Sequence, residues 1–278
     1  MAVRPRSHRG RGQHFLRSSK LAAELVRAAH IQRDDLVLDL GAGGGVLTTA
    51  LARRAGRVVA VEIDPALAAE LERRLPGVEV LVADALRLPL PREPFKVVAN
   101  LPFDGATAIL RRLLDPRVAL VSADVVVDWR LACKRSAVWP STQLSAYWGA
   151  WFELSVVRRL PPCVFAPPPP VEAGVLRVVR RSELLIPVAE RRPYEVFLAR
   201  GYRDGVRAVI PRRELKRCAA ELGFEPGGTA ARPRRTAVGR ALQAFATDVT
   251  FGRGVRRSAG FRTRALGTER RAGLCAPR

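Results

Sequence analysis

The stretch Leu36-Val37-Leu38-Asp39-Leu40-Gly41-Ala42-Gly43-Gly44-Gly45 decides the predicted fold. Its first five residues are mostly apolar, which is typical of a short strand buried in a parallel sheet. The glycines permit a sharp turn and let a ligand approach the backbone closely, and a helix is expected over residues 46–55. A strand, a glycine-rich loop and a helix in this order form a nucleotide-binding unit. We therefore expect an α/β fold.

Acidic residues stand at the ends of the next two predicted strands. The strand 58–64 carries Glu62, and the strand 78–82 is followed by Asp84. Ligands of open α/β sheets bind at the carboxyl ends of the strands. A carboxylate there can accept hydrogen bonds from both hydroxyls of a ribose, so Glu62 is a candidate ribose ligand.

A fourth predicted strand, 95–99, ends in Asn100-Leu101-Pro102-Phe103. The Asn100 side-chain carbonyl and a nearby main-chain carbonyl can both accept hydrogen bonds from one amino group. Pro102 fixes its φ near about −65° and donates no competing N–H, and Phe103 can stack on a planar base. These four residues suit a holder for the exocyclic amine of a nucleobase. Taken alone, they are equally consistent with an ordinary turn next to a core phenylalanine.

The glycine spacing argues against a dinucleotide oxidoreductase. That class uses Gly-x-Gly-x-x-Gly, and the third position here is Val46. The pattern present, Asp39-x-Gly41-x-Gly43-x-Gly45, suits a nucleoside ligand that has no pyrophosphate. Together with the acids and the Asn100 motif at successive strand ends, it favours a functional site over a purely structural arrangement.

Charge indicates a polyanionic partner. The 278 residues carry a formal net charge of +22, and lysine occurs only at positions 20, 96, 134 and 216, so the surplus is almost entirely arginine. Arginine binds phosphates bidentately and stacks on bases, although a GC-rich genome also enriches it.

No apolar run is long enough to span a membrane. The four cysteines do not have zinc-site spacing, so we expect free thiols, no metal site and a cytoplasmic protein.

The motifs and their order resemble those of class I S-adenosylmethionine-dependent methyltransferases. The resemblance covers roughly residues 10–180 and extends weakly to about 225. Within that class the chain resembles the rRNA adenine N6-methyltransferases, which comprise the Erm resistance enzymes and the small-subunit dimethyladenosine transferases. Gln13-His14-Phe15-Leu16 matches the N-terminal Gln-Asn/His-Phe motif of this family. Phe165-Ala166-Pro167-Pro168-Pro169-Pro170-Val171 matches its Phe-x-Pro-x-Pro-x-Val motif.

The resemblance implies S-adenosyl-L-methionine as cofactor and assigns roles to individual residues. Asp84-Ala85 matches the motif at the cofactor adenine, and Phe165 matches the phenylalanine that lies across the target base. The implied cofactor-binding residues are His14, Leu16, Gly41, Gly43, Gly45, Glu62, Asp84, Ala85 and Asn100. The implied catalytic residues are Asn100, Leu101, Pro102, Phe103 and Phe165.

The expected architecture is a Rossmann-like class I methyltransferase sheet, a small C-terminal helical domain and a basic disordered tail. From Ser182 the composition shifts, and Pro187 and Pro193 are expected to lie in a linker before helices at 194–201 and 212–222. The predicted divisions are a basic flexible arm at 1–12, the catalytic domain at 13–181, a helical RNA-binding domain at 182–250 and an arginine-rich tail at 251–278.

The resemblance implies methylation of one adenine in the peptidyl-transferase loop of 23S rRNA, which confers macrolide, lincosamide and streptogramin B resistance. Trp129 with Lys134-Arg135 and the Phe103 variant favour the Erm branch, whereas Leu101 and His14 favour the alternative, a small-subunit (16S) rRNA dimethyladenosine transferase. A non-catalytic RNA-binding protein is the alternative from another class. The charge disfavours a small-molecule methyltransferase. We expect a monomer that does not bind membranes.

Overall fold

The computed structural model describes residues 14–137 and 140–213. The predicted arm at 1–12, the predicted tail at 251–278 and nearly all of the helix expected at 212–222 lie outside these residues. Within the described part, no helix is both long enough and apolar enough to cross a bilayer. Cys133 and Cys163 are free thiols, as expected.

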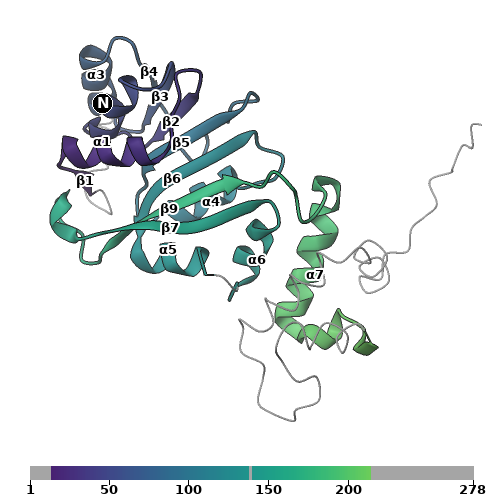
Figure 1. The fold of residues 1–278 in the computed structure, drawn as a ribbon. Coiled ribbons are helices and arrows are strands. Elements are labelled where there is room, and N and C mark those ends of the chain that lie inside the picture. The colour runs from purple at the N-terminus through teal and green to yellow at the C-terminus, as the bar shows by residue number, and fades with distance from the viewer. Residues whose placement is uncertain (1–13, 138–139, 214–278) are drawn as a thin grey trace, which may run out of the picture.

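A seven-stranded sheet forms the centre of the molecule (Figure 1). Its first five strands in spatial order are parallel, and the last two run antiparallel to their neighbours. This arrangement confirms the predicted α/β sheet. The spatial order is β4 (Glu79–Val82), β3 (Arg57–Glu62), β2 (Leu36–Leu40), β5 (Phe95–Asn100), β6 (Leu120–Asp128), β9 (Ala173–Arg180) and β7 (Phe152–Leu160).

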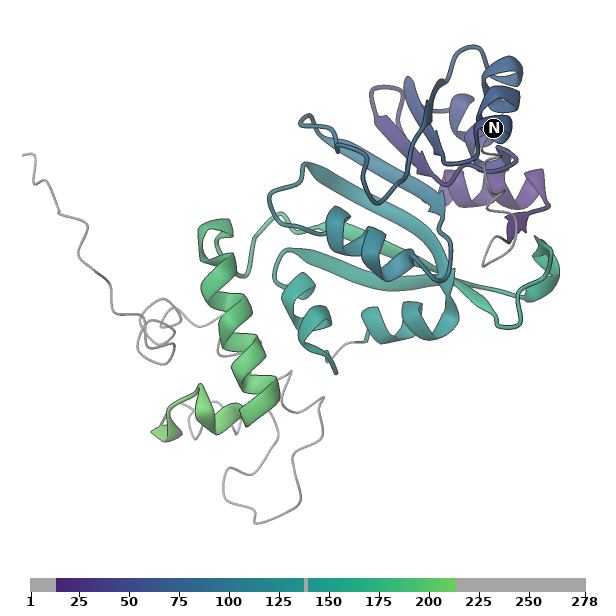
Figure 2. The same ribbon diagram turned by 180° about the vertical axis from the view of Figure 1, so that it is seen from behind.

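Helices cover both faces of the sheet, because its strands are apolar on both sides. Alternate residues of a strand point to opposite faces, so Val37 joins one hydrophobic cluster and Leu38 the other. The first face carries α1 (Ser19–Ala28) and α2 (Val46–Ala52), and the second carries α4 (Ala106–Leu113), α5 (Trp129–Arg135) and α6 (Gln143–Gly149). Figure 1 shows α1 in front of the sheet, and Figure 2 shows α4 from the opposite side.

Side-chain caps fix where several helices begin. The Ser18 hydroxyl accepts a hydrogen bond from the Leu21 amide at the start of α1. Asp64 caps α3 (Pro65–Arg74) in the same way, and Pro65 occupies the first turn, where no amide hydrogen is required. Both caps satisfy amide hydrogens that the first helical turn leaves without a partner.

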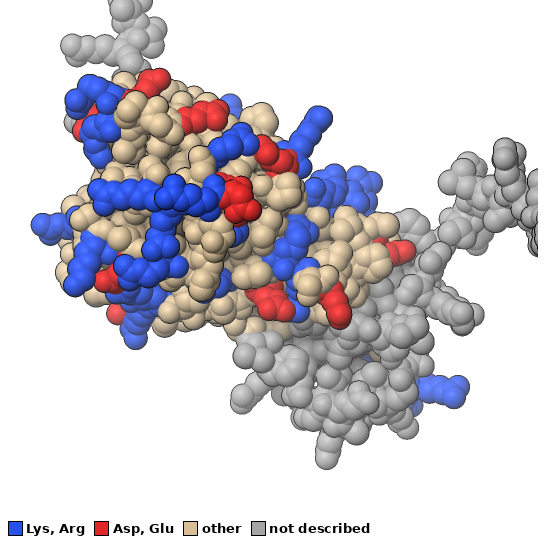
Figure 3. Space-filling view, turned by 45° about the horizontal axis from the view of Figure 1, so that its top comes forward, with Lys and Arg blue, Asp and Glu red and all other residues tan. Residues whose placement is uncertain are grey.

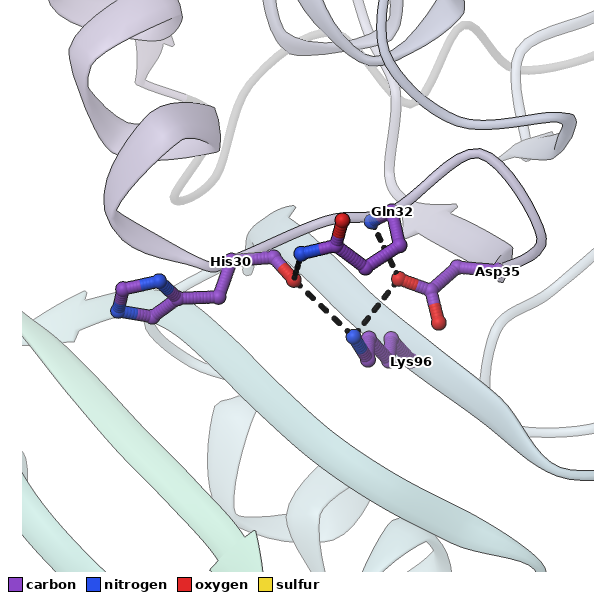
Figure 4. A network of polar contacts seen from close by, with 4 residues as sticks. All are labelled: His30, Gln32, Asp35 and Lys96. Carbon is purple, nitrogen blue, oxygen red and sulfur yellow. Dashed lines mark hydrogen bonds and ion pairs between the residues drawn. The ribbon is translucent and has the colours of Figure 1, made fainter.

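Cations from the sheet hold the C-terminal end of α1. Lys96 of β5 donates to the His30 carbonyl at 3.1 Å and pairs with Asp35 at 2.7 Å (Figure 4). Arg177 of β9 donates to the Ala28 carbonyl at 2.5 Å and to Asp124 at 2.7 Å. Positive charge is favourable where a helix exposes its last carbonyls. These contacts therefore anchor the C-terminal end of α1 to the sheet.

Two short elements were not predicted. β1 (Phe15–Leu16) pairs antiparallel with β8 (Phe165–Ala166), so the N-terminal motif adjoins the proline-rich segment. Three short 3-10 helices, η1 (Pro162–Val164), η2 (Val188–Glu190) and η3 (Val206–Ala208), complete the described elements.

The prediction that Pro193 lies in a linker is wrong. Helix α7 (Arg191–Asp204) begins two residues before it, and proline is compatible with a first helical turn. The helix is joined to the α6 region. The Tyr194 hydroxyl donates to the Ala146 carbonyl at 3.2 Å, and the Trp151 indole donates to the Ile186 carbonyl at 2.8 Å.

We predict that Gly56→Ala destabilises the fold by about 2 kcal/mol, the usual size for overpacking. A Cβ at Gly56 would lie 2.0 Å from the main-chain oxygen of Arg33, which cannot move without displacing the entry to β2. Gly77→Ala is the matched control, since nothing lies within 4 Å of its Cβ. Chemical denaturation measures both free energies of unfolding. Equal values for the two variants would contradict the prediction.

Candidate active site

A cavity opens at the carboxyl ends of β2, β3, β4 and β5, the edge where the sequence places the site. Its walls enclose about 790 Å³, including open solvent. It brings together most of the predicted residues: His14, Gly41, Glu62, Asp84, Ala85, Asn100, Leu101, Pro102 and Phe103. Leu16 and Gly45 line a smaller adjoining hollow together with Gly41 and Asn100.

Gly43 lies beneath an aromatic ring that the sequence reasoning did not assign to the site. A Cβ at Gly43 would lie 2.5 Å from Cε1 of Phe15, and the residue has a left-handed φ of 54°. Both constraints require glycine. Phe15 also lines the cavity. Its position between two motif residues, His14 and Leu16, was the signal that could have identified it.

The Glu62 carboxylate is held by three main-chain amides. Oε2 accepts from Gly43 at 2.7 Å, and Oε1 accepts from Ile63 at 2.9 Å and from Asp64 at 3.0 Å. A carboxylate has about four acceptor sites, so Glu62 can accept about one further hydrogen bond, at Oε2. This leaves room for about one further donor, fewer than the two ribose hydroxyls expected from the sequence.

Asn100 links the sheet to the N-terminal motif. Its Nδ2 donates to the His14 carbonyl at 2.6 Å. The Leu101 amide donates to the Val126 carbonyl at 3.1 Å, which fixes the backbone just beyond β5. The Oδ1 atom of Asn100 is buried and has no hydrogen-bond partner within the described residues. Leaving such an acceptor unpaired costs roughly 1–3 kcal/mol, so the site is prepared for a donor from a ligand.

Three aromatic rings form a row of contacts that begins at the cavity wall. The centroids of His14 and Phe103 are 5.4 Å apart, and Phe165 meets Phe103 edge-on at 6.3 Å. Phe103 lines the cavity, but Phe165 is only 1% exposed and does not. In this conformation Phe165 supports Phe103 from behind. Its predicted contact with a target base stays a prediction, and it requires the Phe165 ring to become accessible.

The N-terminal motif and the proline-rich segment form one wall. Nδ1 of His14 shares a hydrogen bond with the Pro167 carbonyl at 2.8 Å, and the Arg17 amide donates to the Val164 carbonyl at 3.0 Å. These bonds flank the β1–β8 pairing. The position of His14, and through it that of Asn100, therefore depends on the proline-rich segment.

Asp39 is a buried carboxyl beneath the glycine loop. Burial raises its pKa from 3.8 to about 7, against the opposing effect of the Thr48 hydroxyl, which donates to Oδ2 at 2.7 Å. The nearby charge of Glu62 raises it further. Asp84, by contrast, is partly exposed, and its Oδ1 accepts from the Leu86 amide at 2.8 Å.

Comparison with known proteins agrees with this geometry. The family described as ribosomal RNA adenine dimethylase matches residues 5–201. The chain is 34% identical over 209 residues to an rRNA adenine N-6-methyltransferase of Corynebacterium diphtheriae, a match that covers 73% of this chain and 81% of that protein. It is also 34% identical to a probable ribosomal RNA small subunit methyltransferase A of Methanopyrus kandleri, covering 65% of this chain and 66% of that protein.

The fold is similar to that of the solved 23S rRNA methyltransferase ErmE. The TM-score is 0.71 at 30% sequence identity, and the match covers 82% of this chain and 98% of that one. This similarity confirms the predicted class I methyltransferase fold.

We predict that Asp39→Asn raises the melting temperature, relative to the wild type, more at pH 8 than at pH 5. Because the folded pKa is raised, the folded chain holds this proton while the unfolded chain releases it, so stability falls as pH rises from about 4 to about 7. Asparagine removes that dependence and still accepts from Thr48. Asp34→Asn, at an exposed position, is the control in thermal unfolding. An Asp39→Asn effect that is the same at both pH values would refute the prediction.

Proposed function

Because the chain belongs to the ribosomal RNA adenine dimethylase family, we propose that it methylates the N6 amine of one adenine in 23S rRNA with S-adenosylmethionine as methyl donor. Such a modification in the peptidyl-transferase loop would confer resistance to macrolides, lincosamides and streptogramin B. The observation that carries the proposal is the buried, unpaired Oδ1 of Asn100 beside an acid-lined cavity.

The residues present fit the proposed cofactor. Glu62 would use its remaining acceptor position for a ribose hydroxyl, and Asp84, which lines the cavity, would accept from the adenine amine. The glycine loop at Gly41–Gly45 leaves room for the methionine part, since a Cβ at Gly41 has no neighbour closer than 3.9 Å. When bound, S-adenosylmethionine supplies an electrophilic methyl carbon on a sulfonium.

Asn100 would orient the attacking amine. The lone pair of an adenine amine is delocalised into the ring, which makes it a poor nucleophile. Hydrogen bonds from the amine to Oδ1 of Asn100 and to the Leu101 carbonyl would favour a pyramidal nitrogen and direct its lone pair, an effect of proximity and orientation. No strong base is required, because the proton can leave after the nitrogen has become cationic.

Phe103 would hold the base. An enzyme that modifies a base must take it out of its stack, and an aromatic ring replaces part of the stacking energy, about 1–3 kcal/mol per base. Phe103 faces the cavity and is supported by His14 and Phe165. It has no hydroxyl, so stacking is the role its chemistry permits.

The similarity to ErmE supports 23S rRNA as substrate. A small-subunit rRNA dimethyladenosine transferase is the second candidate, favoured by the similarity to the Methanopyrus protein and by Leu101 and His14 in the motifs. In both cases the proposed enzyme acts in the cytoplasm, as a monomer. The buried Oδ1 of Asn100 beside the cavity favours a catalytic role over a non-catalytic RNA-binding protein.

We predict that Asn100→Ala lowers kcat by about 100-fold or more, the size expected when a transition-state hydrogen bond is lost. The affinity for S-adenosylmethionine should change by no more than a few-fold, as measured by calorimetry. Since Nδ2 also holds the His14 carbonyl, the melting temperature is measured alongside. Asp104→Ala, at the exposed neighbouring position, is the control. Equal losses of cofactor binding and transfer would remove Asn100 from the catalytic role.

A methyl-transfer assay with radiolabelled S-adenosylmethionine tests the substrate. We expect label in protein-free 23S rRNA, and we expect it to disappear when the target adenine is replaced by guanine. Label in immature 30S particles alone would establish the small-subunit alternative. Label in neither, with the cofactor still bound, would refute both.

A further inference from the structure

A second concave surface lies on the far side of the glycine loop from the cavity. It is lined by Arg17, just after β1, and by parts of α1, α2 and α3, and it encloses about 840 Å³ including open solvent. We call it the arginine groove. Its arginines are Arg17, Arg27, Arg53, Arg54 and Arg74, and no Asp or Glu is among its lining residues.

One groove arginine, Arg74, is partly compensated, because it pairs with Glu70 of α3 at 3.5 Å. Within the described residues, Arg17, Arg27, Arg53 and Arg54 form no ion pair or hydrogen bond through their guanidinium groups. Glu24 of α1 pairs with Arg158 of β7 at 2.8 Å and thus does not line the groove. Figure 3 shows many arginine and lysine side chains on the visible face, with acidic side chains interspersed among them.

Helix dipoles explain part of this arrangement. Arg27 and Arg74 lie in the last turns of α1 and α3, and Arg53 is the C-cap of α2, where cations stabilise the exposed carbonyls. That effect acts on each helix separately. It does not require cations from different helices to converge on one hollow, and it gives no role to Arg17, which precedes α1.

The groove is continuous with the catalytic end of the sheet. Val46 lines both the groove and the small hollow beneath the glycine loop. Arg74 donates to the Gly44 carbonyl at 3.2 Å, and Arg17 is three residues from His14 at the cavity wall.

We propose that the arginine groove binds the phosphate backbone of the substrate RNA outside the loop that carries the target adenine. This inference rests on the proposed function and adds a contact surface to it. Arginine suits the role because its planar group binds phosphate bidentately. A concave surface without acids also concentrates the positive potential that attracts a polyanion.

The test compares two double variants that lose the same charge. Arg53→Gln with Arg54→Gln removes two exposed groove arginines that touch neither the cavity nor the cofactor residues. Arg33→Gln with Arg92→Gln removes two exposed arginines that precede β2 and β5 and do not line the groove. The dissociation constant of a protein-free 23S rRNA transcript is measured for each over a series of salt concentrations.

The groove variant should bind the transcript roughly tenfold more weakly at low salt. The slope of log K against log salt should become shallower by about 1.4–1.8, since each lost phosphate contact removes about 0.7–0.9. Its affinity for S-adenosylmethionine and its kcat at saturating RNA should match those of the wild type. The control variant should keep both the wild-type slope and the wild-type affinity.

Identical slopes and affinities for the two double variants would overturn the inference, because they would show only an effect of net charge. The outcomes are separable from the proposed function. A wild-type chain that binds the transcript through the groove but methylates no RNA would refute the activity alone. A chain that methylates 23S rRNA while the groove variant behaves like the control would refute the groove alone.

Discussion

The hydrogen bond from Nδ2 of Asn100 to the His14 carbonyl, 2.6 Å long, is the contact on which the rest of the site depends. It joins the end of β5 to a segment 86 residues earlier, and that segment is held in turn by the proline-rich stretch through the β1–β8 pairing. An amide that donates on one side must present its oxygen on the other. The same bond that closes the cavity wall therefore fixes the direction of the unpaired Oδ1.

The sequence contained enough information for the sheet and for most of the cavity. The strand at Leu36–Leu40 was predicted to the residue, because a short apolar run bounded by glycines admits few alternatives. The carboxyl ends of parallel strands share one edge, so residues far apart along the chain, such as Glu62 and Asn100, could be placed together before any coordinates. This part of the prediction rests on topology and did not require side-chain detail.

The parts that could not be predicted depend on tertiary contacts. β1 and β8 are two residues each, too short for any periodicity, and exist only because each pairs with the other. The burial of Phe165 accompanies that pairing, so its position next to Phe103 could not be read from the sequence motif. Pro193 was assigned to a linker because proline interrupts helices, although a first turn tolerates it.

The distribution of charge separates the two surfaces. Within the described residues, the cavity is lined by Glu62 and Asp84 and by no lysine or arginine, whereas the arginine groove is lined by no carboxylate. An acidic cavity repels phosphates and attracts a cationic ligand such as a sulfonium with an ammonium group. A basic groove does the reverse. An RNA would then be held by its backbone outside the cavity, and only an uncharged base could enter. The charges of the two surfaces would therefore keep the RNA phosphates away from the reacting methyl group.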